Sequence, residues 1–343
     1  MFRVSRLAVV ISSGVLALAG TACSSSAQGD GSDPSAADGF EPITIEHAFG
    51  KTVIREKPER VATVNWSNQE VPLALGVVPV GMAAADFGDD DDNGVLPWVE
   101  ERLNELDAET PVLFDETDGI DFEAVADTDP DVILAAYSGL TQEDYGTLSD
   151  IAPVVAFPET AWGTPWRQVI EYNARGMGMA SEGRELIHEL ERQIEQTAAE
   201  RTSIEGSSAM FLTHIDTTDL SKVSFYTTHD TRVKFFDDLG FSQPESIASA
   251  SKGTDQFSLT RAAEKANAFD DVDVIVTYGG KELIASLKAD PLLSKIPAVQ
   301  NEAIVTLPNS APLGTAANPT PLAIPWVLEE YAGLLDDAAA KAK

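Results

Sequence analysis

Cysteine is almost absent from this chain of 343 residues, and Cys23 is the only one. No disulfide can form within the chain, so the fold must depend on its hydrophobic core. Histidine is scarce as well, and the four residues lie far apart in the sequence: His47, His188, His214 and His229. Because bare-metal sites usually gather several imidazoles, we expect no metal site; His214 with Asp216 is the remaining alternative.

Basic residues are few: 23 Lys and Arg stand against 56 Asp and Glu, which gives a formal net charge of −33. Such an excess of negative charge argues against nucleic acid as a partner and against docking on anionic lipid by charge. Beyond the N-terminal region no apolar run reaches the ~20 residues that a membrane-spanning helix needs. Hydrophobic residues still make up 43% of the chain, which is ample for a core.

Motifs of common enzyme classes are missing too. The sequence has no G-x-S-x-G, no H-E-x-x-H and no phosphate-binding loop. The glycine-bearing stretch 175–180 follows no predicted strand, so it is not a dinucleotide fingerprint. We therefore predict that the protein is not an enzyme and binds no cofactor. An exported α/β hydrolase is the alternative, and it would need a serine or carboxylate dyad that we do not find.

The first 22 residues have the layout of a secretory signal. Arg3 and Arg6 precede an apolar run over 7–18, and small residues follow up to Ala22. The layout resembles lipoprotein signals, in which the next cysteine is acylated, although Gly20 stands where such signals usually carry leucine. We expect lipid on Cys23 to anchor the protein to the outer face of the cytoplasmic membrane, at the cell surface. Cleavage that leaves a free thiol is the alternative.

The segment 23–40 is rich in Ser, Gly, Ala and Asp, and we expect a disordered tether there. Beyond it, short Val- and Ile-rich runs alternate with helical patterns. The pattern predicts strands over 61–65, 78–82, 132–137, 154–157, 209–214, 223–226, 274–278 and 303–306. It predicts helices over 69–75, 97–106, 122–126, 142–148, 232–239, 260–268, 281–288 and 325–343. This alternation is typical of parallel sheets flanked by helices.

One long amphipathic helix is predicted over 181–201, where Leu186, Leu190 and Ile194 recur at helical spacing. We therefore predict an α/β fold with two lobes of mostly parallel sheet, over 41–180 and 204–343. One interdomain helix, over 181–203, joins the lobes. A ligand cleft is expected between them, near the ends of the strands.

Several short motifs carry a resemblance to a known family. They are HAFG at 47–50, KPERV at 57–61, LGVVPVG at 75–81, DPDVI at 129–133, LSDIAPVV at 148–155, DVIV at 273–276 and IPAV at 296–299. In this order they resemble the periplasmic-binding proteins of iron–siderophore, haem and cobalamin uptake, which feed ABC importers. The resemblance implies a monomeric receptor that captures a ferric siderophore and delivers it to the permease. A haem or cobalamin receptor is the alternative.

The resemblance also implies two docking residues, because family members pair one glutamate on each lobe with permease arginines. Glu123 matches the first position, in a short helix before the DPDVI motif. Glu264 matches the second position, before the DVIV motif, although Thr260 or Arg261 could be aligned there instead. Solvated acids without a partner are the alternative for both.

A ferric siderophore is a bulky chelate, so its pocket needs aromatic walls and a few cationic or hydroxyl donors. Such residues follow predicted strands at these positions: Trp66, Tyr137, Trp162, Trp166, Tyr226, Arg232, Tyr278 and Lys281. Phe225 alternates with Tyr226, so only one of the two can face the cleft. Asn309 and Asn318 are further candidates in a loop. For each aromatic residue, packing in the core is the alternative.

An acidic segment fits the calcium-loop pattern, with Asp89, Asp91, Asn93, Gly94 and Glu100 at the required spacing. The helix that should precede such a loop is not predicted. We therefore favour a solvated acidic connection.

Overall fold

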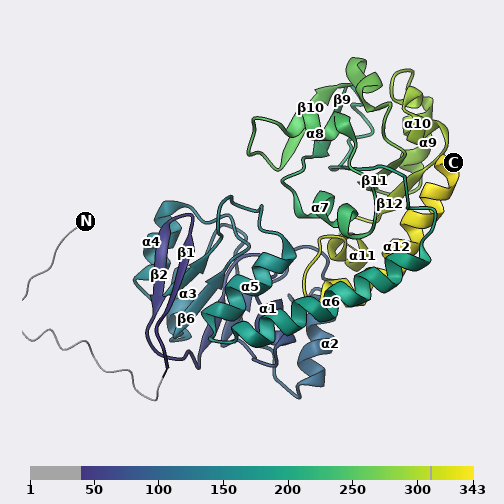
Figure 1. The fold of residues 1–343 in the computed structure, drawn as a ribbon. Helices are drawn as coiled ribbons and strands as arrows, with labels where there is room; N and C mark the ends of the chain where they lie inside the picture. The colour runs from purple at the N-terminus through teal and green to yellow at the C-terminus, as the bar shows by residue number, and fades with distance from the viewer. Residues whose placement is uncertain (1–39, 310) are drawn as a thin grey trace, which may run out of the picture. The chain divides into compact units, whose positions relative to one another are not determined.

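The structure, a computed structural model, describes residues 40–309 and 311–343 (Figure 1). The predicted signal over 1–22, the lipid site at Cys23 and the tether as far as residue 39 lie outside the described residues. Below, the first lobe is the described chain before helix α6 (Ala180–Glu200), and the second lobe is the chain after it.

The first lobe is built on a five-stranded parallel sheet in the order β5-β4-β3-β6-β7. Its strands are β3 (Val61–Thr63), β4 (Gly81–Ala83), β5 (Val112–Phe114), β6 (Val132–Ala135) and β7 (Val154–Ala156). Its helices are α1 (Glu70–Ala74), α2 (Pro97–Glu105), α3 (Phe122–Asp127), α4 (Gln142–Ser149) and α5 (Trp166–Gly176). An antiparallel hairpin of β1 (Ile43–His47) and β2 (Gly50–Ile54), which the pattern did not predict, precedes the sheet.

Side chains of the central strand β6 alternate between two cores. Val132 and Leu134 belong to the core that includes α1 and α5, whereas Ile133 and Ala135 belong to the core that includes α3 and α4. All four residues are buried, as expected for a parallel strand with helices on both faces.

The second lobe has a five-stranded sheet in the order β10-β9-β8-β11-β12. Its strands are β8 (Ala209–Leu212), β9 (Lys222–Tyr226), β10 (Ser258–Ala262), β11 (Val274–Tyr278) and β12 (Ile304–Leu307). Strands β8, β11 and β12 are parallel, while β9 and β10 run antiparallel to their neighbours. Its helices are α7 (Thr231–Asp238), α8 (Glu245–Ser251), η2 (Ala263–Phe269), α9 (Glu282–Ala289), η3 (Leu293–Lys295), α10 (Pro297–Gln300), α11 (Pro312–Ala316) and α12 (Ala323–Ala342).

The α/β prediction is confirmed, with one error in the second lobe. The predicted helix over 260–268 begins too early, because Ser258–Ala262 forms edge strand β10 and the helical part, a 3-10 helix, starts at Ala263. Thr260 pairs with Ser224 of β9, and their hydroxyls form a hydrogen bond of 2.8 Å. Pairing with β9 outweighed the start of a short helical pattern.

Helix α6 joins the lobes with 21 residues, which span about 32 Å at 1.5 Å per residue. It packs against α5 and α12, as Figure 1 shows. Close packing against α5 depends on Gly183, since a Cβ there would lie 2.6 Å from the Cβ of Ala174. Residues of α6, α12 and both sheets belong to one continuous core that includes Leu134, Leu190 and Val276.

A buried carboxylate ties the first lobe to the start of α12. Glu70, which has no exposed surface, accepts a hydrogen bond from Trp98 Nε1 at 2.8 Å through one oxygen. Its other oxygen accepts from the backbone N–H groups of Leu322 at 2.9 Å and Ala323 at 3.3 Å. These N–H groups have no partner within the helix, so Glu70 caps α12 from another part of the chain.

None of the helices in the described ranges combines the length and apolarity needed to cross a membrane.

Candidate ligand-binding cleft

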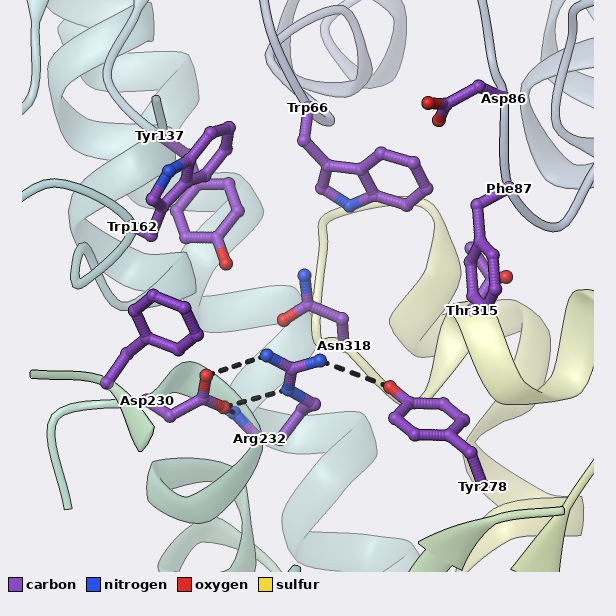
Figure 2. Close-up of a pocket in the computed structure, with 11 residues that line it drawn as sticks. Trp66, Asp86, Phe87, Tyr137, Trp162, Asp230, Arg232, Tyr278, Thr315 and Asn318 are labelled. Atoms are coloured by element: carbon purple, nitrogen blue, oxygen red, sulfur yellow. Dashed lines mark hydrogen bonds and ion pairs between the residues drawn. The ribbon is translucent and has the colours of Figure 1, made fainter. Parts of the chain in front are cut away.

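A cavity of about 360 Å³ lies between the two lobes (Figure 2). The first lobe lines it with Trp66, Asp86, Phe87, Tyr137 and Trp162. The second lobe lines it with Asp230, Arg232, Phe257, Tyr278, Thr315 and Asn318. Trp66 and Tyr137 follow the ends of β3 and β6, and Tyr278 ends β11, so the cavity lies beyond the carboxyl ends of parallel strands. Ligands of open α/β sheets bind at that edge.

The loop that carries Trp66 is locked to the loop that carries Tyr137. The Asn68 side chain donates to the Val64 and Tyr137 carbonyls, both at 2.8 Å, and accepts from Tyr137 N–H at 3.1 Å. The Asn65 side chain accepts from Gly139 N–H at 3.1 Å. These bonds fix the backbone on both sides of Trp66 before any ligand arrives.

Trp162 has a left-handed backbone, with φ of 59°. A non-glycine residue in this region costs on the order of 1 kcal/mol, so the surroundings must hold it there. Its backbone N–H donates to the Ser138 carbonyl at 3.0 Å, and its indole ring meets the Tyr137 ring edge-on with centroids 5.4 Å apart. Trp162 and Tyr137 together form one aromatic wall of the cavity (Figure 2).

Replacing Gly139 by alanine is expected to displace this wall. A Cβ at Gly139 would lie 2.4 Å from Trp162 Nε1, so the indole must move. We expect ligand affinity to fall about tenfold, because one aromatic contact carries ~1–3 kcal/mol of binding energy at such sites. Gly146→Ala is the matched control, since a Cβ there meets nothing within 4 Å. Equal affinity in the two variants, measured by titration calorimetry, would show that Trp162 does not contact ligand.

Arg232 provides the cation of the cavity floor. Its Nε and Nη2 donate to the two Asp230 carboxylate oxygens at 2.8 and 2.7 Å, and its Nη1 donates to the Tyr278 hydroxyl at 3.1 Å (Figure 2). The guanidinium lies 3.7 Å above the centre of the Tyr226 ring. Burial opposes the charge, but the Asp230 carboxylate outweighs it and keeps the pKa of Arg232 above its ordinary value.

Asp230 itself is 1% exposed and also caps α7, where it accepts from Arg232 N–H at 2.9 Å. The pair is therefore electrically neutral as a unit. It still presents unused guanidinium protons to the cavity, because Arg has five donors and the bonds described above use only some of them.

Of the predicted binding residues, five line this cavity: Trp66, Tyr137, Trp162, Arg232 and Tyr278. Tyr226 lies beneath Arg232 instead, with its ring against the guanidinium. Burial raises the pKa of Tyr226, so the phenol stays uncharged. Phe225 points to the opposite core, as the alternation on β9 requires. Asn318 also lines the cavity.

The structure places Trp166 and Lys281 away from the cavity. Trp166 begins α5, is 3% exposed, and donates from Nε1 to Asp238 of the second lobe at 2.9 Å. Arg167 joins the same carboxylate at 2.9 Å, so this contact links the lobes behind the cleft. Lys281 is exposed, because the chain turns at Gly279, with φ of 139°, into α9.

Sequence reasoning missed Asp86, Phe87, Asp230, Phe257 and Thr315. Asp86 and Phe87 follow β4, so the strand-end rule that found Trp66 could have found them too. Phe257 precedes β10, the strand that was mistaken for a helix. His214 lies near the cavity: it stacks on Tyr278 with ring centroids 4.7 Å apart, and Phe87 meets both rings edge-on.

The two predicted docking residues occupy corresponding positions in the lobes. Glu123 lies in the first turn of α3, between β5 and β6, and Glu264 lies in the first turn of η2, between β10 and β11. Both side chains are exposed. Exposure is required for docking but is equally consistent with solvated acids.

The acidic segment forms a compact loop in which Asp89 accepts from the N–H groups of Asp91 and Gly94, at 3.2 and 2.6 Å. Oxygen atoms of Asp89, Asp90 and Asp91 lie within 4.8 Å of one another. As the sequence indicated, the segment between β4 and this loop is not helical. Gly88 packs against Thr315, so the loop also closes one side of the cavity.

Comparison with known proteins adds to this geometry. A family model described as periplasmic binding protein matches residues 61–311. The crystal structure of PiaA from Streptococcus pneumoniae TIGR4 in complex with ferrichrome is 44% identical, with a TM-score of 0.85, and the match covers 88% of this chain and 100% of that one. The probable siderophore-binding lipoprotein YfiY of Bacillus subtilis is 26% identical over 264 residues, which cover 75% of this chain and 74% of the relative. Staphylococcus aureus SirA complexed with staphyloferrin B shares the fold, with a TM-score of 0.63 at 19% identity over 87% of this chain and 98% of that one.

Proposed function

Because the chain belongs to the periplasmic binding protein family, a family of solute-binding proteins, we propose that it captures a ferric siderophore and delivers it to an ABC importer. The observation that carries the proposal is the preformed aromatic cavity between the lobes, with Arg232 held at its floor. The similarity to PiaA, whose crystal structure contains ferrichrome, supports the same ligand class. No chemistry is needed, since binding and release are enough for delivery.

The charges around the cavity favour an uncharged chelate. Arg232 and Asp230 cancel, and Asp86 adds one exposed negative charge at the cavity wall. A ferric tris-catecholate centre carries three negative charges and would be repelled, whereas a ferric trihydroxamate centre carries none. We therefore propose a hydroxamate siderophore as the ligand.

A haem receptor is the second candidate, and the cavity favours it less. Haem iron needs an axial ligand such as a tyrosinate or a histidine. Burial raises the pKa of Tyr137, which disfavours the tyrosinate there. None of the cavity-lining residues within the described ranges is a histidine.

Quenching of tryptophan fluorescence tests the ligand class. Purified protein is titrated with ferrichrome, ferric enterobactin, haemin and cyanocobalamin, and we expect strong saturable quenching by ferrichrome alone. Trp66→Phe and Trp162→Phe should reduce the quenched fraction, because these two residues line the cavity. Trp326→Phe is the matched control outside it. If no ferric chelate quenches the protein, the proposed function is wrong.

The lipid on Cys23 belongs to the same proposal, because a tethered receptor stays within reach of its permease. The description of YfiY as a lipoprotein supports it. Mass spectrometry of the N-terminal peptide is expected to find a diacylglyceryl group on Cys23. An unmodified thiol would refute the anchor without affecting the proposed ligand.

Docking through the two exposed glutamates is the last part of the proposal. We expect Glu123→Ala combined with Glu264→Ala to reduce siderophore uptake by cells at least tenfold while leaving the Kd for ferrichrome unchanged, since rim charges orient a partner. Glu185→Ala with Glu195→Ala, two exposed acids of α6, is the matched control. Normal uptake by the Glu123 and Glu264 variant would exclude these residues from docking.

A further inference from the structure

A second cavity, of about 220 Å³, lies beside the aromatic cavity. Residues 158–160 and 163–165 of the first lobe line it, together with Gln168, His229 and Lys234. The two cavities are lined by consecutive residues, because Trp162 and Asp230 face the first whereas Gly163 and His229 face the second. A ligand in the aromatic cavity therefore lies next to the second cavity.

Lys234 places a positive charge in this second cavity, and this charge has no ion-pair partner within the described part of the chain. Its Nζ donates to the Gly163 carbonyl at 2.8 Å, a bond that crosses between the lobes and leaves further ammonium protons available. Within the described ranges no carboxylate lies within 4.0 Å of Nζ, although the chain has 56 acidic residues. Burial lowers the pKa of Lys234, and the charges of Asp230 and Glu159 oppose that effect from a distance.

Thr164 adds a hydroxyl without a partner. It is 2% exposed, and its Oγ1 makes no hydrogen bond within the described part of the chain. Thr164 and Pro165 precede α5, an 11-residue helix with no side-chain cap and no acid in its first turn. The free N–H groups at this end carry partial positive charge. Thr164, Lys234 and the residue before the N-terminus of α5 thus all line this cavity, and Thr164 also lines a smaller cavity beside Trp166.

The nearby acids, Asp230 and Glu159, do not neutralise the positive charge of Lys234 in this cavity. Both carboxylate oxygens of Asp230 accept hydrogen bonds from one edge of the Arg232 guanidinium, its Nε and Nη2. Glu159 also lines the cavity, but it is exposed, so water and salt screen its charge more than that of Lys234. The floor of the cavity is therefore suited to a negative group that can accept hydrogen bonds.

We propose that the second cavity is a subsite for a carboxylate carried on an arm of the ferric siderophore, with Lys234 as its counter-ion and Thr164 as a hydrogen-bond donor. The inference rests on the proposed function and extends it from the metal centre to the periphery of the ligand. The receptor would then accept an uncharged iron centre in one cavity and a negative substituent in the other.

The test compares two ferric trihydroxamates, ferrichrome, which has no carboxylate, and ferrichrome A, whose acyl arms end in carboxylates. Titration calorimetry should show that Lys234→Met weakens ferrichrome A about tenfold or more, as expected for loss of a hydrogen bond to a charged group, while ferrichrome changes less than about twofold. Lys234→Arg should keep most of the preference. Glu159→Gln should strengthen ferrichrome A, and Lys252→Met, at an exposed lysine, should change neither Kd.

The outcomes separate the two proposals. If the wild-type protein binds neither chelate, the proposed function fails and this inference fails with it. If it binds ferrichrome but does not bind ferrichrome A, or if Lys234→Met changes both Kd values equally, only the carboxylate subsite is refuted. A Lys234-dependent rise of Tm with succinate, without any Lys234-dependent preference between the chelates, would assign the cavity to a free anion and overturn the proposal. Melting curves of each variant show whether it is folded.

Discussion

Arg232→Met is expected to weaken ferrichrome binding about 10- to 100-fold and to lower the free energy of unfolding by about 3 kcal/mol or more. The loss of stability arises because Asp230, 1% exposed, would keep its charge without the two guanidinium bonds that now neutralise it. The loss of affinity arises because the cavity floor loses its donors and the Tyr278 hydroxyl loses its partner.

A double variant separates these two effects. Asp230→Asn keeps the cap of α7, since an asparagine oxygen can also accept from the backbone N–H of residue 232. It removes the buried negative charge that Arg232→Met would leave without a partner. Arg232→Met with Asp230→Asn should therefore regain most of the lost stability in urea unfolding without regaining affinity. If the double variant binds ferrichrome normally, the guanidinium supports the fold and does not contact ligand.

Glu70→Ala is expected to destabilise the protein by about 3 kcal/mol, because three donors lose this carboxylate and, of the three, Ala323 N–H alone keeps another acceptor, Thr320 Oγ1 at 3.3 Å. The donors are Trp98 Nε1 and the N–H groups of Leu322 and Ala323 at the start of α12. Glu101→Ala is the matched control: Glu101 also accepts an indole N–H, from Trp326 at 3.3 Å, but it is exposed. Its loss should cost less than about 0.5 kcal/mol. Equal urea midpoints for the two variants would refute the role of Glu70.

The same residue makes stability depend on pH. Burial raises the pKa of Glu70 above its ordinary value of 4.5, in spite of its hydrogen bonds. Between pH 4.5 and the raised pKa the folded state binds more protons than the unfolded chain, so the free energy of unfolding falls as pH rises through that window. The stability of the wild type relative to Glu70→Gln should therefore grow as pH is lowered from 7 and level off below 4.5. A constant difference across this range would contradict the raised pKa.

Most of the fold could be predicted because buried parallel strands are short, apolar and followed by helices. The pattern failed where that logic does not hold. Strand β5 has three residues, Val112–Phe114, and an apolar run this short is too brief to show a period. Strand β10 alternates half-buried and exposed positions at the sheet edge, and its partner β9 lies more than 30 residues away along the chain. Such pairing is invisible to a local pattern.

The sequence predicted those residues of the site that lie at the end of a strand or just after it. Trp66, Tyr137 and Tyr278 follow or end strands, and the rule located them in the cavity. Trp166 shows the limit of the rule, because a side chain after a strand can bond to the other lobe instead of facing the ligand. No local pattern reports that Asp230 lies under Arg232 with its carboxylate turned away from water, since that depends on the packing of α7.

The core that runs from β6 through α6 to β11 has a consequence for how the molecule melts. Since Leu134, Leu190 and Val276 share it, neither sheet can lose its packing without exposing apolar surface of the other. The lobes therefore form one cooperative unit, and the free energy gained on binding a ligand stabilises residues far from the cleft as much as those that touch it. A variant that weakens this shared core should therefore destabilise both lobes together, and a bound ligand should raise the stability of both.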